Sequence, residues 1–185
     1  MIDKEKISEY VKTAHEIATK HGFHDEKYSD AHWLCLVISE VMEAVEADRK
    51  QHYANRAKYE QEFDALKKDG HMIERRRFFF DLYIKDTTAD EIADAAIRIF
   101  DFIGEKYGDT RYFNFSCSDY GFNQQFTEIA YRFVKDVLGS RVIELTDSIE
   151  YLYAWAKHLG IDLDWHIQQK MKYNRFRPKK HGKQY

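Results

Sequence analysis

Residues that favour turns are scarce in this chain. It has one proline, Pro178, and eight glycines in 185 residues, too few for the many turns of a small all-β domain. Apolar residues instead recur at every third or fourth position along most of the sequence, which is the spacing of amphipathic helices. We therefore expect an all-α fold, and a chain of this length can bury the core of one domain.

The positions of the expected helices follow from this periodicity and from residues that cap helices. The pattern predicts helices over about 3–21, from 29 or 30 to 47, and over 88–106, 123–138, 141–159 and 163–175. The charged stretch 48–69 is compatible with a solvated continuation of the second helix, ended by Gly70. The stretch 74–85 leaves helix and strand open, because short apolar runs do not distinguish them. Residues 109–121 are aromatic, polar and irregular.

Composition excludes several classes of protein. The 29 Lys and Arg residues nearly balance 32 Asp and Glu residues, which is not the basic excess of a protein that binds nucleic-acid polymers. No apolar run reaches the roughly 18 residues of a membrane helix. The charged start lacks an apolar signal region, and two cysteines make no disulfide framework. We expect a soluble, cytoplasmic single domain over 1–178, followed by a mobile basic tail over 179–185.

Two pairs of acidic residues stand out within the apolar helices. Glu40 and Glu43 are three residues apart and share a helix face with apolar neighbours, and Glu91 and Asp94 repeat this spacing. If the two faces meet, each pair of carboxylates about 4 Å apart costs roughly 4 kcal/mol at an effective dielectric near 20. Cations would neutralise such a cluster, and carboxylate oxygens are ligands that suit Mg²⁺ or Mn²⁺.

Structural explanations for the same acids remain open. A single Glu-x-x-Glu on a helix is usually a solvated face, and Glu91 is also placed to complete a capping box with Thr88. Arg98 is spaced to pair with Asp94 and Asp101 in a helical protein whose acids are only salt-bridged. Rival chemistry has no support, because the sequence lacks di-iron, zinc and phosphate-loop motifs and shows no nucleophilic constellation.

The last expected helix carries a third group of polar residues. Lys170 and Asn174 lie one turn apart, and Arg177 follows the helix end. These side chains can supply hydrogen-bond donors to a phosphate group. The alternative is that cations in the last turn merely complement the helix dipole.

Taken in order, the three groups resemble a known family. Glu40-x-x-Glu43, Glu91-x-x-Asp94 and the segment from Lys170 to Pro178 are similar to motifs of the all-α nucleoside triphosphate pyrophosphohydrolases, the MazG-like group that includes dCTP pyrophosphatases. The resemblance covers roughly residues 4–47, 88–104 and 162–183. It implies a four-helix-bundle-like core that assembles as a homodimer or homotetramer. Residues 48–87 and 105–140 are then insertions that add helices.

The resemblance also implies an activity. Members of the family hydrolyse nucleoside triphosphates between the α and β phosphates, with Mg²⁺ as cofactor and Mn²⁺ as a possible substitute. The implied metal ligands are Glu40, Glu43, Glu91 and Asp94. Glu40 or Glu43 would orient or deprotonate the attacking water.

The implied substrate contacts come from the C-terminal helix and from one aromatic residue. Lys170, Asn174 and Arg177 would contact phosphate or sugar. Trp33 or a nearby aromatic would stack on the base, although an ordinary core position is the competing interpretation. The alternative function is a non-catalytic helical module that binds a nucleotide or a protein on the same scaffold.

Overall fold

The computed structural model describes residues 3–66, 72–108, 115, 120–139 and 145–182. All regular structure in these ranges is helical, which confirms the all-α prediction. The elements, in chain order, are α1 (Lys4–Lys20), α2 (Asp30–Arg49), α3 (Arg56–Leu66), α4 (Met72–Tyr83), α5 (Thr88–Tyr107), α6 (Phe126–Gly139), α7 (Leu145–His158), α8 (Leu163–Asn174) and the short 3-10 turn η2 (Lys179–Gly182).

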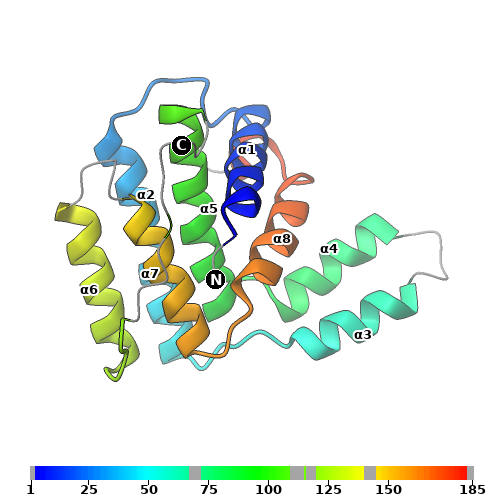
Figure 1. The fold of residues 1–185 in the computed structure, drawn as a ribbon. Helices are drawn as coiled ribbons and strands as arrows, with labels where there is room; N and C mark the ends of the chain where they lie inside the picture. Colours follow the sequence, from blue (N-terminus) through cyan, green and yellow to red (C-terminus); the bar gives the residue numbers. More distant parts are fainter. Residues whose placement is uncertain (1–2, 67–71, 109–114, 116–119, 140–144, 183–185) are drawn as a thin grey trace.

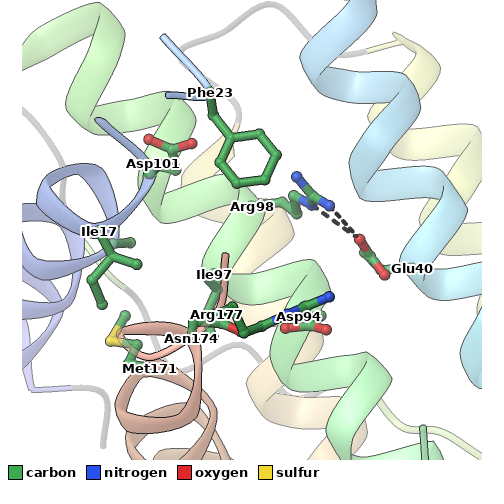
Figure 2. Close-up of a pocket in the computed structure, with 12 residues that line it drawn as sticks. Ile17, Phe23, Glu40, Asp94, Ile97, Arg98, Asp101, Met171, Asn174 and Arg177 are labelled. Atoms are coloured by element: carbon green, nitrogen blue, oxygen red, sulfur yellow. Dashed lines mark hydrogen bonds and ion pairs between the residues drawn. The ribbon is translucent and has the colours of Figure 1, made fainter. Parts of the chain in front are cut away.

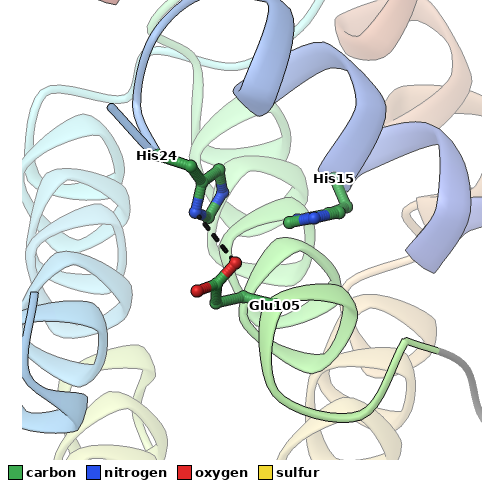
Figure 3. A group of neighbouring side chains, drawn as sticks. All are labelled: His15, His24 and Glu105. Atoms are coloured by element: carbon green, nitrogen blue, oxygen red, sulfur yellow. Dashed lines mark ion pairs between the residues drawn. The ribbon is translucent and has the colours of Figure 1, made fainter. Parts of the chain in front are cut away.

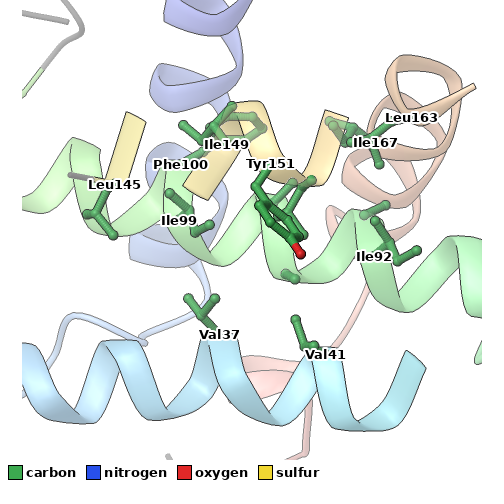
Figure 4. Close-up of a cluster of buried hydrophobic side chains, with 14 of the residues drawn as sticks. Val37, Val41, Ile92, Ile99, Phe100, Leu145, Ile149, Tyr151, Leu163 and Ile167 are labelled. Atoms are coloured by element: carbon green, nitrogen blue, oxygen red, sulfur yellow. The ribbon is translucent and has the colours of Figure 1, made fainter. Parts of the chain in front are cut away.

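Helix α5 lies at the centre of the molecule, packed against α1, α2, α7 and α8 (Figure 1). It is buried nearly all round, as expected for a helix that has apolar residues on most of its surface. Figure 4 shows Val37 and Val41 of α2 facing Ile92 and Ile99 of α5 across this core. The packing is that of a helical bundle, so the expected bundle-like core is confirmed.

Helix starts follow local capping chemistry. At the N-termini of four helices, the side-chain oxygen of the cap residue accepts a hydrogen bond from a backbone N–H of the first turn. These caps are Asp3 for α1, Ser29 for α2, Thr87 for α5 and Asp162 for α8. The expected capping box of Thr88 with Glu91 is wrong by one residue. Thr87 is the cap of α5, and its hydroxyl accepts from the N–H of Asp90 at 3.4 Å. Glu91 is therefore not needed as a capping residue.

The segment after α2 forms a separate helical pair. The suggested continuation of the second helix to residue 69 is wrong, because α2 ends at Arg49 and the backbone turns through the left-handed conformation of Gln51, at a φ of 55°. Helices α3 and α4 then project together from the bundle beside α8 (Figure 1). Tyr59 of α3, Phe80 of α4 and Tyr173 of α8 form a small core there. The stretch 74–85 is thus mostly helical, and Gly70 lies outside the described residues.

The second expected insertion is described only in part. Helix α6 begins at Phe126 rather than at residue 123, and α7 is described from Leu145, so that residues 141–144 lie outside the described part. Of the expected irregular stretch, residues 115, 120 and 121 are described, and none is helical. Helix α6 packs against α2 and α7. This insertion therefore contributes to the bundle itself.

The beginning of the basic tail is held against the body of the protein. The N–H of Lys180 donates to the carbonyl oxygen of His21 at 2.7 Å, and the Lys179 ammonium lies 2.6 Å from a carboxylate oxygen of Asp25. Residues 179–182 thus contact the region after α1, the mobility of the tail stays a prediction, and residues 183–185 lie outside the described range. Among the helices that the structure describes, none is both long and apolar enough to cross a membrane.

Candidate functional site

Three acidic residues from two helices converge where α2 packs on α5. One carboxylate oxygen from each of Glu40, Glu43 and Glu91 lies within 4.8 Å of the others. Glu40 and Glu91 are buried, at 3% and 4% exposure, whereas Glu43 is exposed. The sequence prediction that the acidic faces of the two helices meet is confirmed for these three residues.

The fourth predicted ligand, Asp94, is held by a buried lysine instead. An oxygen of Asp94 lies 2.7 Å from the Lys170 ammonium, and an oxygen of Asp90 lies 2.5 Å from the same group. Lys170 is only 2% exposed. The structure therefore places Lys170 between two aspartates of α5. A direct contact with phosphate would require an ammonium group on an open surface, and Lys170 is not on one. Sequence analysis did not identify Asp90, the second partner of Lys170.

Arg98 forms the second cation pair of the cluster. Its Nε and Nη2 atoms both donate to Oε1 of Glu40 at 2.9 Å (Figure 2). The pairing with Asp94 and Asp101, which the helix spacing suggested, is therefore wrong. The partner comes from α2, so this ion pair ties the two acid-bearing helices together.

Burial and mutual repulsion shift the proton affinities of the cluster. Burial raises the pKa of Glu91 to about 9, and the nearby carboxylates of Asp94, Asp90 and Glu40 add to the shift. Burial likewise raises the pKa of Asp90 to about 7, against the attraction of Lys170. Burial opposes the charge of Lys170, yet the two aspartates raise the pKa of its ammonium above the ordinary value. At neutral pH, Glu91 therefore holds a proton.

A small cleft adjoins the cluster, with about 60 Å³ of space that a water-sized molecule can enter. Glu40, Asp94 and Arg98 lie on one side of it, and Asn174 and Arg177 come from the end of α8 and the residues after it (Figure 2). The remaining lining residues are Ala14, Ile17, Ala18, Phe23, Ile97, Asp101 and Met171. The cleft thus combines a charged wall with an apolar one, which is a common arrangement in small-molecule sites.

Asn174 has an unmet hydrogen-bonding capacity in this cleft. The residue is 6% exposed, and its side-chain carbonyl oxygen is buried without a hydrogen-bond partner among the described residues. A buried acceptor of this kind costs free energy unless a donor reaches it. A hydroxyl or amino group of a ligand would satisfy it, and so would a water molecule.

Trp33 does not reach the cleft. It is 4% exposed, belongs to the main core, and stacks on His24 with ring centroids 5.0 Å apart. The core interpretation of Trp33 is therefore the correct one, and the base-stacking role is wrong for this residue. The aromatic side chain that lines the cleft is Phe23. It follows Gly22, which comes after the C-cap His21 of α1 and has a φ of 79°.

The donor set fits a hard divalent cation. Carboxylate oxygens are the ligands of Mg²⁺ and Mn²⁺, and a bound cation would offset the burial and the repulsion that together raise the pKa of Glu91. Glu40, Glu43 and Glu91 are the residues best placed to hold it, with Asp94 one turn further along α5. Comparisons with protein-family models, curated proteins and solved structures return no match. The site must therefore be judged on its own chemistry.

Proposed function

We propose that this chain is a Mg²⁺-dependent nucleoside triphosphate pyrophosphohydrolase, which releases the monophosphate and pyrophosphate. The observation that carries the proposal is the convergence of Glu40, Glu43 and Glu91 at the edge of a cleft that is lined by Glu40 and Asp94. Asn174 and Arg177 line the same cleft, and their amide and guanidinium groups can bind sugar and phosphate. The sequence resemblance to MazG-like enzymes supports the same reaction.

In this proposal the four acids share one role, and Glu43 has a second. Glu40, Glu43, Glu91 and Asp94 would hold the ion, which supplies polarisation of the phosphate oxygens and a lowered pKa of bound water. Glu43 is exposed, so its carboxylate can orient a water molecule and accept its proton. The water oxygen bonds to the α-phosphorus, the bond from that phosphorus to the bridging oxygen breaks, and pyrophosphate leaves.

The residues from α8 and the segment after it include one positioning group and two substrate contacts. Lys170 is enclosed by Asp90 and Asp94, so it positions the acids of α5 and leaves the phosphate contacts to others. Arg177 lines the cleft and can donate two parallel hydrogen bonds to a phosphate. Asn174 offers its unsatisfied carbonyl oxygen to a sugar hydroxyl.

Pyrophosphate release from a panel of ribo- and deoxyribonucleoside triphosphates, with Mg²⁺, Mn²⁺ or EDTA, tests the reaction. We expect metal-dependent release with the monophosphate as co-product. Glu40→Gln and Asp94→Asn should abolish turnover while the helical circular dichroism signal is kept. Glu128→Gln, which removes an exposed acid on α6, is the matched control and should retain full activity. Absence of product from folded protein across the panel would reject the proposal.

A non-catalytic nucleotide-binding module is the second candidate, and the two ion pairs favour it. Arg98 already neutralises Glu40, and Lys170 neutralises Asp94, so part of the acid set is satisfied without metal. This candidate predicts nucleotide binding that is equally tight with EDTA, together with no hydrolysis. Isothermal titration with a non-hydrolysable triphosphate separates the two functions.

The proposal includes assembly as a homodimer or homotetramer and a cytoplasmic location. Both expectations come from the sequence, and the first rests on the family resemblance. Sedimentation velocity tests the first, because a monomer at working concentrations would contradict it. Imaging of the full chain in cells tests the second.

A further inference from the structure

A second group of metal-binding residue types lies at the other end of α5 from the acidic cluster. It comprises His15 of α1, His24 in the connection between α1 and α2, and Asp101 and Glu105 of α5. One ligand atom from each of His15, His24 and Glu105 lies within 4.8 Å of the others. Figure 3 shows these three side chains pointing toward one another. No role in the proposed hydrolysis uses this group.

Asp101 orients both imidazole rings. Its Oδ1 atom lies 3.0 Å from Nδ1 of His15 and 2.8 Å from Nε2 of His24, and the carboxylate is buried at 5% exposure. Because a carboxylate only accepts hydrogen bonds, the ring hydrogens lie on these two nitrogens. In the neutral rings, Nε2 of His15 and Nδ1 of His24 then carry the lone pairs. A carboxylate that orients a metal-binding histidine in this way is a regular feature of metal sites.

Glu105 supplies a third ligand on the same side. Its Oε2 atom lies 3.3 Å from Nδ1 of His24, the nitrogen that Asp101 leaves available. Side-chain exposures of 43% for Glu105 and 31% for His15 give an ion access from solvent.

The surrounding structure holds the rings in place. Residue 104 must be glycine for α1 to approach α5, because a Cβ atom there would lie 2.6 Å from Cβ of His15. The ring of His24 is stacked on buried Trp33 and meets the ring of His15 at 4.7 Å between centroids. The two imidazoles are thus fixed before any ion binds, which lowers the cost of ordering the site.

We propose that His15, His24 and Glu105 form a Zn²⁺ site in which Asp101 orients the two histidines. Two imidazoles and one carboxylate are a typical three-ligand set for Zn²⁺, with a fourth position left for water. The acidic cluster at the other end of α5 has only oxygen ligands and suits Mg²⁺. The two sites therefore differ in the metal that they select, and the proposal does not depend on the hydrolytic function.

Equilibrium dialysis of the full chain against Zn²⁺, with Mg²⁺ in excess to fill the acidic cluster, tests the site. We expect one Zn²⁺ per chain, and Co²⁺ in its place should give the intense visible absorption of a tetrahedral complex. His15→Gln and His24→Gln should each abolish that absorption, and Asp101→Asn should weaken binding by roughly 10- to 100-fold. Glu105→Gln changes an exposed side chain, so it provides a ligand variant that should fold normally.

Two controls separate this site from others on the chain. His158→Gln removes an exposed histidine at the end of α7 and should bind Zn²⁺ as the original chain does. Glu40→Gln combined with Glu91→Gln disables the acidic cluster and should also leave Zn²⁺ binding unchanged. The proposal would be overturned if the folded protein failed to bind Zn²⁺. It would also be overturned if the double variant His15→Gln with His24→Gln bound Zn²⁺ as tightly as the original chain. The four residues would then be a polar network that only joins α1 to α5.

Discussion

The most informative single change in the acidic cluster is Glu91→Gln. Glu91 is buried, and no cation is bonded to it among the residues that the structure describes. Burial and the neighbouring carboxylates raise its pKa from an ordinary value of 4.5 to about 9. Glutamine has the size of the protonated side chain and cannot ionise. The substitution therefore removes the titration while it keeps the volume.

The raised pKa makes folding sensitive to pH in a definite direction. Between pH 4.5 and about 9, the folded protein keeps a proton on Glu91 that the unfolded chain releases. The folded state then binds more protons, so this residue lowers the free energy of unfolding as the pH rises through that window. At pH 7 the accumulated loss is about 3 kcal/mol, from 1.36 kcal/mol for each pKa unit between 4.5 and 7.

Urea unfolding with EDTA present measures this effect. Near pH 5, the free energy of unfolding of the Glu91→Gln variant should be close to that of the original chain. By pH 7, the variant should be more stable than the original chain by about 3 kcal/mol. Glu128→Gln, the exposed control on α6, should show no such growth. Added Mg²⁺ should stabilise the original chain more than the variant, because the ion takes the place of the proton on Glu91. A difference between Glu91→Gln and the original chain that stays constant with pH would refute the reasoning.

Three further predictions concern stability. Lys170→Met leaves buried Asp90 and half-buried Asp94 without their cation and should cost about 3–5 kcal/mol in urea unfolding at neutral pH. Burial lowers the pKa of His166 from 6.5 to about 4, so the folded state loses stability as the pH falls through this window, and acid titration of His166→Asn should show a smaller loss. Gly104→Ala places a methyl group against His15 and should cost about 1–3 kcal/mol, measurable as a lower Tm.

The helices that could be predicted closely are those whose limits are set by nearby residues. Helices α1, α2, α5 and α8 begin within about a residue of the expected positions, because apolar periodicity and a capping side chain coincide there. The end of α2 could not be predicted from its own charged continuation. It depends on the left-handed turn at Gln51 and on the N–H of Thr88 donating to the carbonyl oxygen of His52, which lies far away in sequence.

The site shows the same division between local and distant causes. The spacing of the acids placed each pair on one apolar helix face, and the structure shows that Glu40, Glu43 and Glu91 meet where these faces pack. Spacing along a helix could not identify the partner of Arg98, because that partner is on another helix. It could not show that Lys170 is enclosed either, since the burial of that side chain depends on how α8 packs against α5.

The charges of the cluster also decide which experiment separates a metal site from a salt-bridged core. From the sequence, Glu40→Gln with Glu43→Gln suits this purpose, because a metal site without metal should gain stability. In the structure, however, Glu40 is the partner of the half-buried Arg98, so its removal also leaves a cation unpaired and lowers stability. Glu91 has no bonded cation among the described residues, so its removal carries no such penalty. A gain in stability for Glu91→Gln that Mg²⁺ reverses would therefore report the cost of burying this carboxyl among other carboxylates, and not the loss of an ion pair.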